Sequence, residues 1–203
     1  MKTKEVVLAS NNLGKLNELT TLLSKTNIKV FPQSYFKIQE IEEDGLSFVE
    51  NALKKARNAC LISNKPAIAD DSGIEVDALN GAPGIYSARY SETESDHGNN
   101  IKLLKNLNNV TEKNRTARYQ CVIVFMKNAS DPTPIICQGT WEGIILREPK
   151  GKNGFGYDPL FFIPSLKKTA AELPQEVKNK YSHRAKALRN LVSCLKNDLK
   201  ENK

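Results

Sequence analysis

A chain of 203 residues is long enough to bury a hydrophobic core, either as one large domain or as two closely associated lobes. Hydrophobic residues make up 39% and charged residues 26%, which is typical of a folded protein, and no apolar run approaches the roughly 18 residues that a bilayer span requires. The net charge of +7 favours anionic partners, but the basic residues do not alternate with aromatic ones as in many nucleic-acid-binding surfaces. We therefore expect neither nucleic acid nor a membrane as a partner.

The start of the chain and its cysteines indicate the compartment. The apolar stretch near Met1 is too short for a signal peptide, which favours a cytoplasmic protein. None of the four cysteines belongs to a C-x-x-C pair, so we expect small apolar side chains in a reducing compartment rather than disulfides or zinc ligands.

The first elements along the chain are a strand over Glu5–Ala9, a helix over Leu13–Leu23 and a second strand over Ile28–Phe31. The junction between the first strand and the helix is rich in hydrogen-bond donors and ends in a lysine. A helix N-terminus of this kind can bind phosphate, although the P-loop pattern is absent and an ordinary helix cap followed by a surface lysine remains open. The candidate phosphate-binding residues are Ser10, Asn11, Asn12, Leu13, Gly14 and Lys15.

An acidic stretch over residues 39–45 precedes the next helix. Its carboxylates, Glu42 and Glu43 among them, are suitable ligands for Mg²⁺ together with phosphate oxygens, but a solvated acidic loop is the commoner outcome for such a run. The helix that follows has the clearest signals: Ser47 and Glu50 form a capping box, and the sequence predicts its end near Ser63–Asn64.

A short buried strand over Pro66–Ala69 then runs into Asp70-Asp71-Ser72-Gly73, which is either a turn or a catalytic or metal-binding site. Because neighbouring side chains of an extended backbone point to opposite faces, only one of Asp70 and Asp71 can point squarely into a given cleft.

The second half begins with a Gly- and Pro-rich loop, followed by a helix over Ile101–Leu107 and two long strands over Ala117–Met126 and Pro134–Leu146 that could pair antiparallel. The last helix carries an apolar stripe from Ala185 to Leu199. The pattern predicts an α/β fold with an elongated mixed β-sheet flanked by helices, forming one domain over residues 1–203 with two lobes around a central active-site cleft.

Two further segments carry chemistry. In the Gly-rich segment around Phe155, Gly156, Tyr157 and Asp158, glycines would let the backbone approach a ligand while a ring stacks on a planar base; a hairpin closed by core aromatics is the alternative. The other segment comprises Lys178 and, at the start of the last helix, His183 and Arg184. His97 lies in a polar stretch and is expected at the surface.

Together these segments resemble the inosine triphosphate pyrophosphatase family, also called XTP/dITP diphosphatases, over nearly the whole chain and in order. The resemblance rests on S-N-N-L-G-K at 10–15, E-E-D-G-x-x-F-x-E-N-A at 42–52, A-D-D-S-G-I-E-V-D-A-L at 69–79, G-A-P-G-I-Y-S-A-R-Y at 81–90, G-F-G-Y-D-P-L-F at 154–161 and S-H-R-A-K-A-L at 182–188. Asn11 stands where bacterial members often have glycine.

The resemblance implies a homodimeric enzyme that uses Mg²⁺ to hydrolyse ITP, dITP and XTP to the nucleoside monophosphate and pyrophosphate. Asp71 would be the catalytic carboxylate and a metal ligand, with Glu42 or Glu43 completing the metal site. The residues at 10–15 would hold the triphosphate, Lys55 would reach a phosphate, and Ser72 would bind substrate. The base pocket would comprise Phe155, Gly156, Tyr157, Asp158, Lys178, His183 and Arg184.

Two alternatives remain open at this stage. One is a pyrophosphatase for other nucleotides, such as modified pyrimidines. The other is a non-catalytic nucleotide- or RNA-binding module, which would bind without metal-dependent turnover and, for RNA, with a steep salt dependence.

Overall fold

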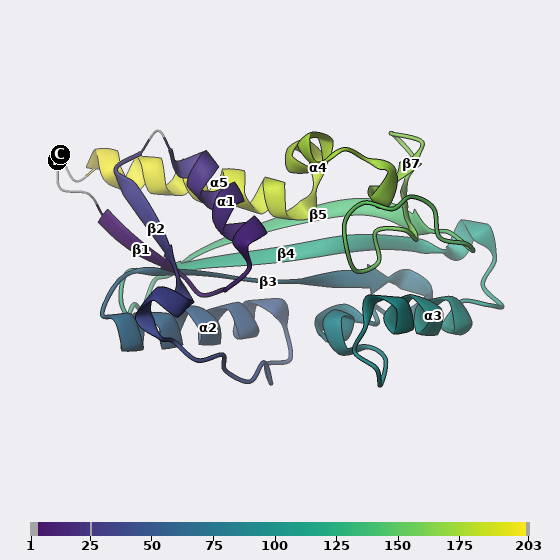
Figure 1. The fold of residues 1–203 in the computed structure, drawn as a ribbon, viewed down its shortest axis with the longest axis horizontal. Helices are drawn as coiled ribbons and strands as arrows, with labels where there is room; N and C mark the ends of the chain where they lie inside the picture. The colour runs from purple at the N-terminus through teal and green to yellow at the C-terminus, as the bar shows by residue number, and fades with distance from the viewer. Residues whose placement is uncertain (1–3, 25, 202–203) are drawn as a thin grey trace. The chain divides into compact units, whose positions relative to one another are not determined.

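The computed structural model describes residues 4–24 and 26–201, and within them seven strands form one sheet in the order β2-β1-β3-β4-β5-β6-β7 (Figure 1). β1 is parallel to β2 and β3, whereas β6 is antiparallel to β5 and β7, so the expected mixed sheet is confirmed. The strands are β1 (Lys4–Leu8), β2 (Ile28–Pro32), β3 (Ala67–Val76), β4 (Thr116–Met126), β5 (Ile135–Ile145), β6 (Phe161–Ile163) and β7 (Lys168–Thr169).

The α-helices are α1 (Leu13–Leu23), α2 (Phe48–Ser63), α3 (Asp96–Asn106), α4 (Gln175–Tyr181) and α5 (His183–Glu201). The first three begin where a side-chain oxygen of Asn12, Ser47 or Ser95 accepts a hydrogen bond from a backbone N–H of the first turn. α2 ends at Asn64, which adopts the left-handed conformation that terminates helices. The predicted bounds of α1 and α2 are confirmed.

Three details differ from the sequence predictions. The strand predicted over Pro66–Ala69 is longer than expected, because β3 runs without interruption from Ala67 to Val76, and of the two alternatives for Asp70–Gly73 the turn is excluded. α3 begins at Asp96 rather than at Ile101, since its first turn is polar and gives no apolar periodicity. The seven-residue helix α4, which carries Lys178, was not predicted.

The chain divides into two compact units. The first unit comprises the described residues of Met1–Asp71, Cys121–Gln138 and Lys186–Lys203. In this unit α1 and α5 lie on one face of the strands and α2 lies on the other (Figure 1). Leu19 and Leu23 of α1 and Leu188 and Leu191 of α5 join one buried cluster with the strands. On α2 the buried residues after the first turn include Ala52, Ala56, Ala59 and Cys60, which are small and let this helix pack closely.

The second unit comprises Ser72–Gln120 and Gly139–Ala185. Its buried cluster joins Leu103 and Leu107, in and just after α3, to Ile74 on β3, Trp141 on β5 and Phe161 on β6. A loop over residues 150–160 leads into β6.

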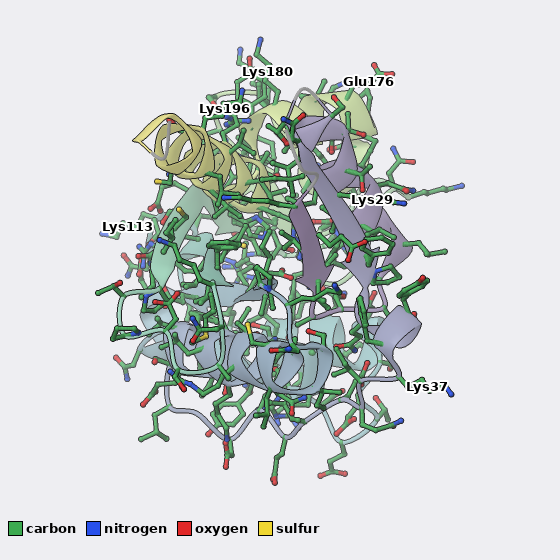
Figure 2. All side chains as sticks on the ribbon, turned by 90° about the vertical axis from the view of Figure 1, so that its left-hand side faces the viewer. Lys29, Lys37, Lys113, Glu176, Lys180 and Lys196 are labelled. Atoms are coloured by element: carbon green, nitrogen blue, oxygen red, sulfur yellow. The ribbon has the colours of Figure 1, made fainter. Side chains whose placement is uncertain are left out.

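The lysines labelled in Figure 2, Lys29, Lys37, Lys113, Lys180 and Lys196, belong to different segments of the chain, and all are exposed. All four cysteines are free, as expected. No helix in residues 4–24 and 26–201 combines the length and the apolar character that a bilayer crossing requires.

One buried cation anchors the second unit. Arg115 is only 1% exposed, and its guanidinium donates to the carbonyl oxygens of Leu107 at 2.7 Å, Ile145 at 2.8 Å and Leu146 at 3.0 Å. These bonds tie the end of α3 to the end of β5.

Replacing Arg115 with methionine should lower the free energy of unfolding by about 3 kcal/mol, because three buried bonds from a charged donor are lost together. Urea denaturation measures the change. Arg147→Met is the matched control, since Arg147 also donates to a backbone carbonyl, that of Val110, but is half exposed. An equal loss in both variants would contradict this role for Arg115.

Candidate functional site

The first group of candidate residues surrounds Asp71, in the first unit. The Asp71 side chain is buried on β3, where its Oδ2 accepts a hydrogen bond from Asn51 Nδ2 at 3.2 Å and its Oδ1 lies 3.4 Å from Lys55 Nζ. Asn51 and Lys55 are four residues apart on α2, so both side chains stand on the same face of the helix. The capped helix therefore presents one amide and one ammonium group to a single carboxylate.

The acidic loop reaches the same place. Glu43 Oε1 lies 2.6 Å from Lys55 Nζ, so one ammonium group joins two carboxylates that are 28 residues apart in the sequence. The loop is held by the backbone N–H of Gly45, which donates to Asn51 Oδ1 at 2.8 Å; a Cβ at Gly45 would lie only 2.6 Å from that oxygen. Glu42 is exposed. Of the two candidate glutamates, Glu43 is the one beside Asp71.

Burial and two charged neighbours act on the pKa of Asp71, and not all in the same direction. Burial raises its pKa above the usual value for an aspartate, the positive charge of Lys55 lowers it, and the negative charge of Glu43 raises it; the net result is a raised pKa. Burial tends to lower the pKa of Lys55, but Asp71, Asp70 and Glu43 outweigh it and hold the pKa above the usual lysine value. The lysine therefore remains charged while the aspartate is poised to accept a proton.

Asp70, the preceding residue, has a different partner. Its carboxylate is 6% exposed and lies 2.9 Å from Lys15 Nζ of α1. Because α1 and α2 cover opposite faces of the strands (Figure 1), the two consecutive aspartates point to opposite faces, as expected for an extended backbone. Lys15 is therefore the counter-ion of a buried carboxylate and not only a surface lysine.

The remainder of the candidate phosphate segment forms the start of α1. Asn12 Oδ1 accepts from the backbone N–H of Lys15 at 3.1 Å, and Ser10 Oγ accepts from that of Asn12 at 3.1 Å. Leu13 is 69% exposed, and Asn11 and Gly14 are exposed as well. The segment is thus an ordinary helix cap and also an open helix N-terminus.

The second group lies in the second unit and centres on Asp158. This carboxylate is 5% exposed; it lies 2.5 Å from Lys178 Nζ and accepts from Tyr119 Oη at 3.3 Å and from the backbone N–H of Phe155 at 3.1 Å. A Cβ at Gly154, whose φ is +80°, would collide with the same carboxylate. The buried ion pair therefore fixes the Gly-rich loop from within.

The other base-pocket candidates adjoin this centre. The ring of Tyr119 stacks on that of His183, with centroids 4.7 Å apart and an interplanar angle of 12°. Arg184 Nη2 lies 3.4 Å from Ser72 Oγ. Phe155 is 66% exposed, and Lys178 Nζ lies 5.6 Å from its ring centroid. An exposed ring beside cationic groups is a suitable surface for stacking a planar base.

Tyr157 takes a different position from its neighbours. Its side chain is 3% exposed in the core, and its hydroxyl donates to the carbonyl oxygen of Ser87 at 2.7 Å. Burial raises the pKa of this hydroxyl far above the usual value. In this structure Tyr157 anchors the loop to the core, and its ring offers no open face to a ligand.

Sequence reasoning assigned no role to Asn51 or Tyr119. Asn51 lies on the buried face of α2 and is fully buried, and a polar residue on an apolar helical face is a signal of a buried partner. Tyr119 lies on the same face of β4 as the buried Ala117 and Cys121. This position predicts that Tyr119 is buried, but it does not predict contacts with Asp158 and His183. Asp158 and His183 follow Tyr119 by 39 and 64 residues in the sequence.

A divalent ion is compatible with the first group. In the described part of the chain no three His, Cys, Asp or Glu side chains converge closely enough to hold a metal by themselves. Mg²⁺, however, commonly takes only one or two carboxylates together with substrate phosphates and water. Glu43 and Asp71 already share the positive charge of Lys55, so they offer two oxygen ligands of the right kind.

The fold is that of a known family of nucleotide pyrophosphatases. Residues 6–194 match the Ham1 family, and the chain belongs to it. The inosine triphosphate pyrophosphatase resemblance found in the sequence motifs is thereby confirmed.

Relatives and solved structures agree with this assignment. A protein of Thioalkalivibrio sulfidiphilus named dITP/XTP pyrophosphatase is 56% identical over 94% of this chain and 98% of its own length, and one of the same name from Escherichia coli is 51% identical over 96% and 99%. The structure of a HAM1 protein from Coxiella burnetii has a TM-score of 0.93 at 49% identity, covering 96% of this chain and 99% of that one. A nucleoside-triphosphatase, or dITP/XTP pyrophosphatase, from Mycobacterium abscessus has a TM-score of 0.76 at 35% identity, covering 95% and 97%.

The two charged neighbours of Asp71 should move its pKa in opposite directions. Lys55→Met should raise the pKa further, because a positive charge is removed, and Glu43→Gln should lower it, because a negative charge is removed. Carboxyl-carbon NMR titration of the protein in the presence of a chelator measures both. Shifts of the same sign would contradict the opposite influences of Lys55 and Glu43 on the pKa of Asp71.

Proposed function

We propose that this protein hydrolyses deaminated purine nucleoside triphosphates, namely ITP, dITP and XTP, to the nucleoside monophosphate and pyrophosphate. The activity named for its full-length relatives supports the proposal, since they are more than 50% identical to it. The observation that carries it within the molecule is the buried Asp71, held by Asn51 and Lys55 beside Glu43.

The reaction joins water to the nucleotide and breaks the bond between the α and β phosphates. Asp71 orients a water molecule and accepts its proton. Asn51 fixes one carboxylate oxygen, so the other is directed toward the reacting water. Pyrophosphate leaves with its negative charge stabilised by Lys15, Lys55 and the N-terminus of α1, with Ser10, Asn11, Asn12, Leu13 and Gly14 lining that end.

The cofactor is Mg²⁺, held by Asp71 and Glu43, with the exposed Glu42 as a further candidate ligand. When bound, the ion neutralises phosphate charge and lowers the pKa of a bound water. Lys55, which pairs with both carboxylates in this structure, is then available to pair with a phosphate oxygen.

Selectivity arises in the second group. Hypoxanthine and xanthine carry a carbonyl at the 6-position, where adenine carries an amino group. Donors on His183 and Arg184 pair with a carbonyl but face an amino group without an acceptor, a mismatch worth on the order of 10⁴-fold. Phe155 stacks on the base, Ser72 binds substrate beside Arg184, and Tyr157, Asp158 and Lys178 fix the loop.

The remaining proposals concern the setting of the enzyme. We expect the whole chain, residues 1–203, to act as one catalytic domain in a cytoplasmic homodimer, with nucleotides and neither nucleic acid nor membranes as partners.

A pyrophosphate-release panel with ITP, dITP, XTP, ATP, GTP and dTTP, with and without Mg²⁺, tests the function. Deaminated purine nucleotides should be hydrolysed only with the metal, and ATP should be slower by on the order of 10⁴-fold in kcat/KM. A preference for dTTP would favour a pyrimidine pyrophosphatase instead. Binding without any turnover would favour a non-catalytic module.

Asp71→Asn should lower kcat by at least about 10²-fold, because the amide cannot accept the proton. Turnover and the thermal midpoint at neutral pH are measured on the same preparation. Near-normal turnover would exclude Asp71 as the base.

A further inference from the structure

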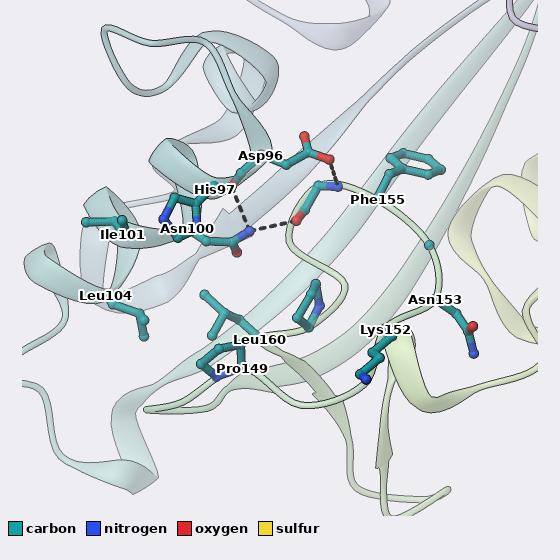
Figure 3. A pocket seen from close by; sticks show the side chains of 13 residues that line it. Asp96, His97, Asn100, Ile101, Leu104, Pro149, Lys152, Asn153, Phe155 and Leu160 are labelled. Carbon is teal, nitrogen blue, oxygen red and sulfur yellow. Dashed lines mark hydrogen bonds between the residues drawn. The ribbon is translucent and has the colours of Figure 1, made fainter.

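The exposed ring of Phe155 stands on a loop with little regular structure to hold it. Residues 151–160 form bends and turns rather than a helix or strand, and Gly154 and Gly156 have positive φ angles of +80° and +61°. A pocket of about 320 Å³ lies between this loop and α3, lined by apolar side chains that include Ile101, Leu104 and Leu160 (Figure 3). Because side chains do not fill this space, packing alone does not fix the loop on that side.

Two side chains of α3 bridge the gap to a single residue of the loop. Asp96 Oδ2 accepts from the backbone N–H of Gly156 at 2.7 Å, and Asn100 Nδ2 donates to its carbonyl oxygen at 2.8 Å, as the dashed lines in Figure 3 show. Both backbone groups of Gly156 therefore bond to α3. The two side chains are four residues apart and so lie on the same face of the helix.

The start of α3 is built to hold these side chains. Ser95 Oγ caps the helix by accepting from Gly98, and Asn100 Nδ2 also donates to the carbonyl oxygen of Asp96. The first turn of a helix stabilises a carboxylate such as Asp96 through the helix dipole. Asp96 and Asn100 thus support each other as well as the loop.

Phe155 is consequently fixed on both sides. Its own backbone N–H bonds to Asp158, and the next residue, Gly156, bonds to α3. The ring itself is 66% exposed and points away from Leu104 and Leu160 (Figure 3). An aromatic ring kept in water on a restrained backbone gains from stacking without first having to be ordered.

We propose that Asp96 and Asn100 are positioning residues that set the affinity of this enzyme for the nucleobase by fixing Gly156 and, through it, the ring of Phe155. The inference rests on the proposed function, since it assigns the base to this loop. Both residues bond to the loop assigned to the base and not to the residues assigned to the phosphates, so the two should act on nucleotide binding and not on the chemical step.

The test compares Asp96→Ala and Asn100→Ala with the wild type. Each should raise KM for dITP about tenfold and change kcat less than about threefold, because binding is weakened and the reacting groups are untouched. Inhibition by pyrophosphate, which has no base, should be unchanged in both. The two variants reach Gly156 through independent side chains, so misfolding of one does not decide the result.

Two matched variants sharpen the comparison. Asp96→Asn keeps a side-chain oxygen able to accept from Gly156 and should restore most of the affinity for dITP. His97→Ala alters an exposed side chain that lines the same pocket, between the two positioning residues, and should behave as wild type.

The outcomes separate the two proposals. A wild-type chain that releases no pyrophosphate from dITP overturns the proposed function and the nucleobase role with it. An active wild type whose KM is unchanged in both alanine variants, or whose KM and pyrophosphate inhibition change together, overturns the positioning role alone.

Discussion

Two consecutive carboxylates are buried in the middle of β3, and much of the candidate site depends on how their charges are balanced. Asp70 pairs with Lys15 from one face, and Asp71 bonds to Asn51 and Lys55 from the other. Burying such groups without partners would be costly, so α1 and α2 must be placed with their polar residues aimed at β3. The same requirement brings Glu43 beside Asp71 through the shared Lys55.

The second group follows the same physical rule with a different result. Asp158 is buried with Lys178 as its counter-ion, and its remaining capacity as an acceptor goes to Tyr119 and to the backbone of Phe155. A buried ion pair adds little net stability, but it specifies one arrangement of the groups around it. Here that arrangement is the path of the Gly-rich loop, which keeps the ring of Tyr157 in the core and leaves the ring of Phe155 exposed to water.

The two groups divide the work of the proposed reaction. The first offers carboxylates and cations, which are suited to phosphate, a divalent ion and water. The second offers an exposed ring and hydrogen-bond donors, which are suited to a planar base. Asp71 and Ser72, the last residue of one unit and the first of the other, are consecutive in β3, so a single strand supplies both groups.

The sequence alone determined the mixed α/β fold, the bounds of α1 and α2 and the family, because capping residues, helical periodicity and uninterrupted motifs are local signals. It could not show that β3 continues through Asp70–Gly73, since turn residues become strand residues once their charges are paired by distant lysines. It also left open the choice between Glu42 and Glu43 and gave no role to Asn51, Tyr119 or Asp96. Those assignments depend on contacts between segments far apart in the chain, and only tertiary packing decides which side chains meet there.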